Sequence, residues 1–202
     1  MRKIVPLLLV LTAAVPAAAQ DIQLPPGTEL ETRTDGDLNG DGVDDIAFLA
    51  GNEDSRSLTV LLSAKGEVDV DFTAETLELE PTMFGPGTLT IAGNVLTFED
   101  LTGGTTAIAS NRRFRYDGLR KRMRLIGLDA TVYSRTNAHD GFETSWNLLN
   151  GDTITRELRL VEGAGEDAYE NGRERRFKRR IRPQFLADSP DPETTLEEAR
   201  QG

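Results

Sequence analysis

The sequence predicts an all-β protein, and three observations indicate this class. Apolar and charged residues alternate with the period of two that a half-buried strand requires, as at Leu77 to Glu80. Glycine-rich turns separate short apolar runs at the spacing typical of a sandwich or barrel. After the first residues, only Glu193 to Gln201 has a helical period. We therefore expect a single β-rich domain of about a dozen short strands, a sandwich or an open barrel.

The strands follow one another along the whole domain. The uninterrupted apolar run at Ile46 to Ala50 favours a buried strand. Thr88 to Ile91 and Val95 to Glu99 flank Gly93-Asn94, where glycine in the first central position favours a type II′ hairpin turn. The other expected strands are Ser57 to Leu62, Glu67 to Phe72, Leu77 to Glu80, Thr105 to Ala109, Arg113 to Tyr116, Arg122 to Asp129, Phe142 to Leu148, Thr153 to Val161 and Arg173 to Pro183.

The chain divides into four segments. In residues 1–19, Arg2 and Lys3 precede an apolar run that ends in Ala17-Ala18-Ala19, the pattern of a cleaved secretory signal. An extended entry segment covers residues 20–34, the β-rich domain residues 35–186, and a flexible or weakly helical tail residues 187–202. The signal predicts a periplasmic or secreted bacterial protein with no transmembrane segment after cleavage.

Charge and cysteine content narrow the possible partners. Without Arg2 and Lys3 the chain has 21 basic and 34 acidic residues, a net charge of −13 instead of −11. We therefore expect no nucleic-acid partner, because an acidic chain of this kind is a poor general binder of nucleic acid and anionic membranes. The chain has no cysteine, so an exported domain of this sequence has no disulfide to stabilise it. A bound structural cation would be one substitute.

The segment DLNGDGVDD, residues 37–45, carries the clearest candidate site. Asp37, Asn39, Asp41 and Asp45 occupy relative positions 1, 3, 5 and 9, and Val43 at position 7 offers its backbone carbonyl. Calcium binds six to eight oxygen atoms, and a sharply turned loop supplies them from alternate residues. A glycine at position 6 permits that turn. These five residues are therefore the predicted calcium ligands.

Two other structures fit part of this pattern. An EF-hand requires a glutamate at position 12, where this chain has Phe48, and a helix where this chain has a strand-like run. An Asx-turn loop needs no metal, because Asp, Asn and Gly favour turns for backbone reasons alone. Three carboxylates within nine residues repel one another without a cation, and this favours the metal site.

The loop and the strand after it resemble the calcium loops of FG-GAP and VCBS-type repeats. Together with Phe114 to Gly118, Arg124 to Asp129 and Ser145 to Gly151, the loop is similar to a group of uncharacterised exported bacterial proteins. The chain departs from that group at Asn150 and lacks the cysteine pair of many members. The resemblance implies a fold and a calcium-type loop, but no known catalytic activity. Only one such loop occurs, without an internal repeat, so we expect no propeller.

Two basic clusters, residues 112–124 and 173–182, stand out in this acidic chain. Both could bind an anionic partner such as lipopolysaccharide, peptidoglycan or another polyanionic polymer. Structural ion pairing with the acid-faced strands at Glu67 to Asp71 and Glu78 to Glu80 is the stronger explanation, because charged cross-strand pairs are common in sheets. The candidate anion-binding residues are Arg176, Lys178, Arg180 and Arg182.

No catalytic residue is assigned from the sequence. The single His139, beside Asp140, is expected in an exposed hairpin tip. A Gly-x-Ser-x-Gly elbow is missing, as is a cysteine nucleophile. Paired carboxylates are frequent, but glycosidase chemistry needs two that face each other across a cleft.

These observations predict an exported, non-enzymatic calcium-binding β-domain with a structural or binding role in the bacterial envelope. Its ligand would be an envelope or extracellular molecule that the sequence does not identify. Two alternatives stay open: a polyanion- or glycan-binding module that uses the basic strands, and an envelope glycan hydrolase.

Overall fold

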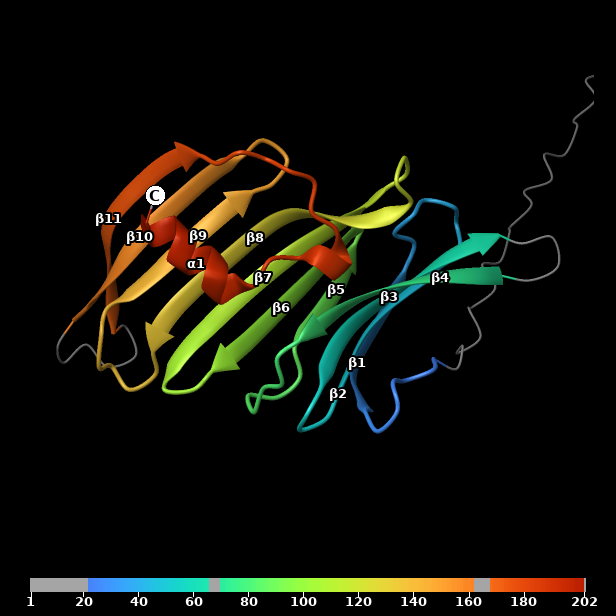
Figure 1. Cartoon of the computed structure of the whole chain (residues 1–202), viewed down its shortest axis with the longest axis horizontal. Helices are drawn as coiled ribbons and strands as arrows, with labels where there is room; N and C mark the ends of the chain where they lie inside the picture. The colour runs from blue at the N-terminus through green and yellow to red at the C-terminus, as the bar shows by residue number, and fades with distance from the viewer. Residues whose placement is uncertain (1–21, 66–69, 162–167, 202) are drawn as a thin grey trace, which may run out of the picture.

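The computed structural model describes residues 22–65, 70–161 and 168–201. Over these residues the chain forms eleven strands in two antiparallel sheets, with a short 3-10 turn and one α-helix near the end (Figure 1). Neither sheet is closed into a barrel, and no propeller is present in the described part. The prediction of an all-β fold is therefore confirmed, and of the two forms that the sequence left open, the described residues form two open sheets. The proposed signal, residues 1–19, lies outside the described residues.

The first sheet has four strands in chain order, β1 (Glu29–Gly36), β2 (Asp45–Gly51), β3 (Arg56–Lys65) and β4 (Val70–Leu79). All seven residues of β2 are buried. Both faces of β2 are covered, and this explains why the run from Ile46 to Ala50 contains no polar side chain. Strand β1 begins inside the expected entry segment of residues 20–34: residues 29–36 pair along β2.

The second sheet is a seven-stranded meander. Its strands are β5 (Thr88–Ala92), β6 (Val95–Gly103), β7 (Thr106–Asp117), β8 (Arg122–Ser134), β9 (Gly141–Asn147), β10 (Asp152–Leu160) and β11 (Tyr169–Lys178). Each strand pairs with the next one in the chain, as short turns require. Ala92 pairs with Val95 around Gly93, whose φ is 58°, so the predicted two-residue hairpin forms.

Some expected strands are parts of longer ones. Two expected strands, 105–109 and 113–116, merge into the single strand β7, because residues 110–112 between them pair with β8 without interruption. A bulge after Arg113 shifts the register inside this strand. Leu77 to Glu80 and the described end of Glu67 to Phe72 likewise belong to β4.

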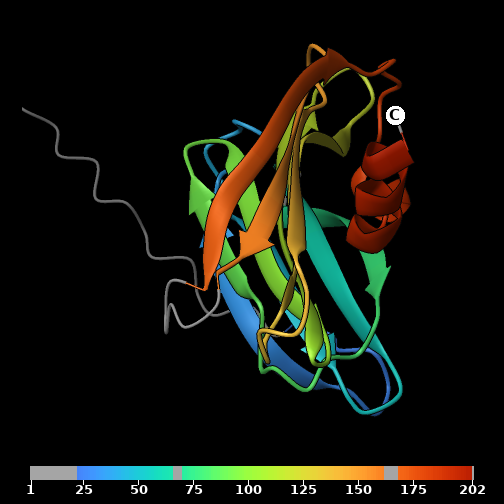
Figure 2. The same ribbon diagram turned by 90° about the vertical axis from the view of Figure 1, so that its left-hand side faces the viewer.

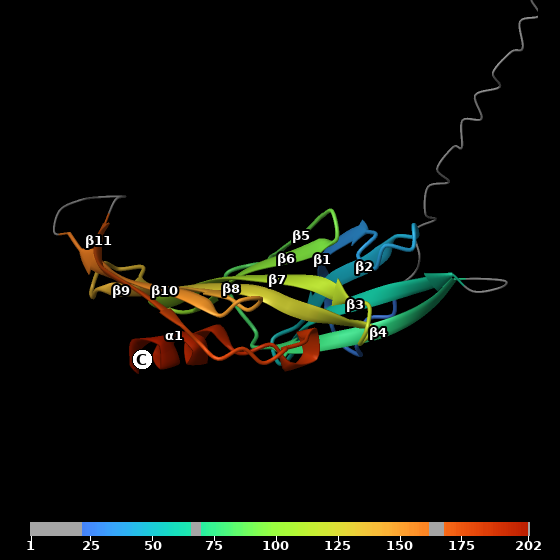
Figure 3. The ribbon, with the colours of Figure 1, turned by 90° about the horizontal axis from the view of Figure 1, so that it is seen from above.

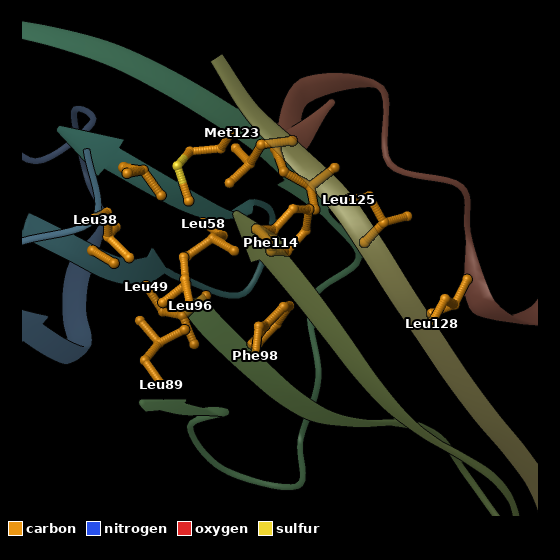
Figure 4. Packing of buried hydrophobic residues seen from close by; sticks show 14 of the residues in the cluster. Leu38, Leu49, Leu58, Leu89, Leu96, Phe98, Phe114, Met123, Leu125 and Leu128 are labelled. Carbon is orange, nitrogen blue, oxygen red and sulfur yellow. The ribbon is translucent and has the colours of Figure 1, made fainter. Parts of the chain in front are cut away.

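The main core lies between the two sheets. Leu49 and Leu58 of the first sheet meet Leu96, Phe98 and Phe114 of the second (Figure 4). Phe98 and Phe114 are fully buried, and large aromatic side chains of this kind contribute most to core stability. A smaller cluster covers the outer face of β2, where Ile22 and Leu24 of the entry segment pack against Phe48.

The C-terminal tail is an ordered part of the domain. After η1 (Leu186–Asp188), the helix α1 (Pro192–Gln201) lies against the seven-stranded sheet, beyond the end of the four-stranded one (Figures 2 and 3). Leu196 and Ala199 are buried, and Leu196 packs against Ile108 and Ala130. The helical part of the prediction is confirmed, but the tail is docked rather than flexible, because its few apolar residues share one face.

Within the described part of the chain, no helix has the length and apolarity that crossing a membrane requires.

Candidate functional site

The DLNGDGVDD loop connects β1 to β2 at one end of the first sheet. Pairing of Gly36 with Asp45 closes it, and Gly40 and Gly42 have φ angles of 84° and 83°. These left-handed conformations favour glycine, which has no Cβ to clash with the backbone. Leu38 points into the main core and is 1 % exposed (Figure 4), so the loop is fixed to the interior.

The Asp37 side chain organises the first half of the loop. Its Oδ1 accepts a hydrogen bond from the Gly40 amide at 2.6 Å, and its Oδ2 accepts one from the Gly42 amide at 2.9 Å. Each carboxylate oxygen has about two acceptor sites, so each keeps one free.

Two consecutive Asx turns follow, in each of which a side-chain oxygen accepts a hydrogen bond from the amide two residues later. Asn39 Oδ1 accepts from the Asp41 amide at 2.9 Å, and Asp41 Oδ1 accepts from the Val43 amide at 2.8 Å. The Asp41 side chain and its glycine neighbours are exposed, so this half of the loop faces solvent.

Asp45 is buried and holds the loop to β3. Its Oδ2 accepts from the amides of Leu38 at 2.7 Å and Asn39 at 3.0 Å, and its Oδ1 accepts from the amide and hydroxyl of Ser63 at 2.6 and 2.9 Å. Burial raises the pKa of Asp45, while hydrogen bonds from Ser63, Leu38 and Asn39 act in the opposite direction. With its acceptor sites taken, this carboxylate anchors the loop.

The remaining oxygen atoms define what the loop can bind. Asp37 supplies a half-buried carboxylate, Asp41 an exposed one and Asn39 an amide oxygen. Val43 supplies a carbonyl oxygen that lies 3.4 Å from the Ser63 hydroxyl. In the described part of the chain, no group of three or more His, Cys, Asp or Glu side chains is arranged to hold a metal ion. The loop thus presents oxygen donors in successive turns, and Asp45 behind them supports the backbone.

The strand that carries the second basic cluster is shorter than the sequence predicts, and two of its cations form ion pairs. Strand β11 ends at Lys178, so the expected strand from Arg173 to Pro183 is too long at its C-terminal end, and Arg180 and Arg182 lie outside it. Arg176 Nε lies 2.8 Å from Glu174, and Lys178 Nζ lies 3.1 Å from Asp152.

The expected acidic partners of these cations also need correction. Strand β11 pairs with β10, whereas β4 lies in the other sheet (Figure 1). The acids that neutralise β11 are therefore its own neighbours. One acid of β4 does reach a basic cluster: Glu75 accepts from the Met123 amide at 2.7 Å and from Arg122 at 3.3 Å, and so joins the two sheets.

His139 lies in the exposed turn between β8 and β9, as predicted. Its Nε2 is 2.9 Å from Thr106 Oγ1, and its Nδ1 is 2.7 Å from the Asp140 carbonyl oxygen. Both ring nitrogens thus have turn-stabilising partners.

Sequence reasoning missed a buried ionic cluster between the sheets. Arg56 of β3 is 2 % exposed, and its Nη1 donates to both carboxylate oxygens of Asp100, at 3.0 and 2.9 Å. Its Nε contacts both oxygens of Glu31 at 3.0 Å. Arg56 therefore links β1, β3 and β6. No local signal identifies it, because Asp100 is 44 residues away along the chain.

A second missed residue is Arg112 of β7, which is 4 % exposed. Its strand alternation was available from the sequence, since Arg112 shares a face with Ile108, Ser110 and Phe114, all of them buried. It adjoins a cavity of about 400 Å³. The cavity lies where β4, β6, β7 and the start of α1 meet; its lining includes Glu78, Glu80, Asp100, Ser110, Arg112, Ser189, Asp191 and Glu193.

Comparison with known proteins finds no matching family model, no similar curated protein and no similar solved structure.

Proposed function

We propose that this chain is an exported, non-catalytic β-domain of the bacterial envelope whose β1–β2 loop binds calcium. The observation that supports the calcium site is the series of oxygen donors that the successive turns of this loop carry. Asp37, Asn39 and Asp41 lie in successive turns, each with a side-chain oxygen already oriented by a backbone amide. Pre-orientation of this kind lowers the entropic cost of binding an ion.

The affinity expected for this loop is low. Two carboxylates, one amide and one carbonyl leave coordination positions to water, and Asp45 is engaged with Ser63 and Leu38. Calcium sites of extracellular modules have dissociation constants on the order of 10⁻⁴–10⁻³ M, a range that suits a calcium-rich exterior. The ion would then stabilise the junction of β1 and β2 in a protein that has no disulfide.

A thermal melt with calcium, with magnesium and with chelator tests this proposal. At 10 mM calcium, which is roughly 10–100 times the expected dissociation constant, binding to the folded state raises the melting temperature by about 3–10 °C. Magnesium gives a smaller shift, because it dehydrates reluctantly and demands octahedral geometry.

Asp41→Asn is the informative variant. The asparagine oxygen still accepts from the Val43 amide, so the turn is retained, but one negative charge is lost. We expect an unchanged melting temperature in chelator and a reduced calcium shift. Asp54→Asn, in the exposed β2–β3 turn, is the matched control and keeps the full shift. If calcium raises the melting temperature equally in the wild type and in Asp41→Asn, or in neither, the loop is a turn that binds no calcium.

A further inference from the structure

Arg112 is a buried cation without a polar partner. Its Nε has no hydrogen bond, and its guanidinium forms no ion pair with the described residues. Its contact is with the Phe98 ring, whose centroid lies 5.6 Å from Arg112 Cζ. Burying a charge is costly unless it is paired and hydrogen-bonded. A residue of this kind is therefore informative about what the neighbouring cavity accepts.

The nearest acids do not satisfy this arginine. Asp100 already holds Arg56 through both of its oxygens, and Asp191 accepts from the Thr194 amide at 2.9 Å, at the start of α1. Both act on Arg112 through their charges alone: burial lowers the pKa of Arg112, and Asp100 and Asp191 oppose this. An arginine does not deprotonate in proteins, so its N–H donors still need acceptors.

A neutral donor without a partner lines the same cavity. Ser189 Oγ, in the link between η1 and α1, is buried and has no hydrogen-bond partner. The Arg112 guanidinium and the Ser189 hydroxyl together match a carboxylate, which has two oxygens and accepts bonds from both kinds of donor.

The outer lining has the opposite charge. Glu78 and Glu80 of the β4 end, together with Asp191 and Glu193 at the start of α1, line the cavity and are exposed. Four carboxylates at the mouth would repel a simple anion, whereas Arg112 in the interior would repel a simple cation. The distribution suits a ligand that carries both charges.

We propose that this cavity binds a small zwitterion, an amino acid or the equivalent end of a short peptide. Its carboxylate would meet Arg112 and Ser189, and its ammonium group would face the acids at the mouth. The cavity of about 400 Å³ is within the range of small-molecule sites. This proposal does not depend on calcium, because the loop of residues 37–44 does not line the cavity.

Isothermal titration calorimetry on the whole chain tests the proposal with five probes. Glycine, L-alanine and glycylglycine carry both charges, acetate carries only the carboxylate, and methylammonium carries only the cation. We expect saturable binding of at least one zwitterion, and binding of acetate and methylammonium that is weaker by about tenfold or more. Acetate binding as tight as that of the best zwitterion would overturn the proposal, as would the absence of any zwitterion binding up to about 50 mM.

Variants assign the binding to this cavity. Arg112→Met keeps the apolar stem but removes the guanidinium, and it should weaken zwitterion binding by about tenfold or more. Arg115→Met, on the same strand with an exposed side chain, is the matched control and should bind as the wild type does. Ser189→Ala should weaken binding by a smaller factor. Unchanged affinity in Arg112→Met would refute the site.

Two further measurements separate binding from folding. If Arg112 serves a ligand, Arg112→Met should melt at the wild-type temperature or above it, since an unpaired buried cation is removed. A large fall in melting temperature would instead make Arg112 a structural partner of Asp100 and would contradict the proposal. Should that variant not fold, the side-chain N–H signal of Arg112 in the wild-type NMR spectrum must shift on addition of the zwitterion; an unmoved signal rejects it.

Discussion

At the scale of single residues, three buried charges are handled in three ways. Asp45 is surrounded by donors from Leu38, Asn39 and Ser63. Arg56 is neutralised by two carboxylates. Arg112 has neither arrangement, and this contrast within one molecule makes it a candidate binding residue rather than a structural one. Burial alone therefore does not distinguish a structural charge from a binding residue. The number of hydrogen-bond and ion-pair partners of the charged group distinguishes them.

Arg56→Met provides a test of the ionic cluster. The substitution leaves Asp100, whose side chain is 4 % exposed, as an unpaired charge between the sheets. We expect a loss of about 3–5 kcal/mol in the free energy of unfolding, the usual cost of removing one partner from a buried pair. Urea denaturation measures the loss.

An exposed ion pair is the appropriate comparison for Arg56. Arg120 is 52 % exposed and contacts Asp117 at 3.1 Å across a turn. Arg120→Met should lower the free energy of unfolding by no more than about 1 kcal/mol. If the two arginine variants lose equal stability, the buried cluster does not join the sheets in the way described.

At the scale of elements, the sequence is a good guide wherever the causes are local. The hairpin at Gly93 and the buried run of β2 depend on turn chemistry and on period-two patterns, and both form as predicted. The merging of two expected strands into β7 depends on the pairing of residues 110–112 with β8, which no local pattern shows. The docking of α1 depends on a sheet face built from strands more than fifty residues earlier.

The candidate sites divide in the same way. The loop of residues 37–45 is visible because its donors are adjacent in the chain, whereas the cavity around Arg112 joins side chains from β4, β6, β7 and the start of α1. The anchoring role of Asp45 was not predictable either, because its partner Ser63 lies 18 residues away, on the next strand, β3. Long-range pairing, rather than local pattern, decides such cases.

The contribution of the docked helix α1 to stability can be tested through one side chain. Leu196 is 2 % exposed and fills a cluster with Ile108 and Ala130. Leu196→Ala should cost about 2–5 kcal/mol, from lost burial and from the cavity left behind. Chemical denaturation monitored by circular dichroism gives the value. Glu197→Ala, on the exposed face of the same helix, should change stability by less than about 0.5 kcal/mol, and equal losses would mean that the helix is not docked.

At the scale of the whole molecule, burial differs strongly between strands, and we expect local stability to differ with it. The four-stranded sheet and α1 lie on the same side of the seven-stranded sheet (Figure 3). Together they cover its strands from β5 to β9, as the clusters around Phe98 and Leu196 indicate. Strand β11 has no buried residue over its ten positions, whereas every residue of β2 is buried.

This difference predicts a gradient of amide hydrogen exchange along the molecule. Regions with few buried contacts open locally, and core strands exchange only when the whole domain unfolds. Amides of β2 should therefore exchange only through global unfolding. Their exchange rates should rise steeply with urea concentration, and the free energy of opening that they give should equal the free energy of global unfolding. Peptides of β11 should exchange faster, with little dependence on urea. Mass spectrometry of exchange at low urea concentrations measures both.

The variant Leu196→Ala tests the part that α1 plays in this gradient. At urea concentrations below the unfolding transition, it should accelerate exchange in β9, which α1 contacts, and leave exchange in β2 unchanged. Equal protection of β11 and β2 would show instead that the two sheets and the helix unfold as one cooperative unit, and the uncovered end of the large sheet would then be as stable as its core.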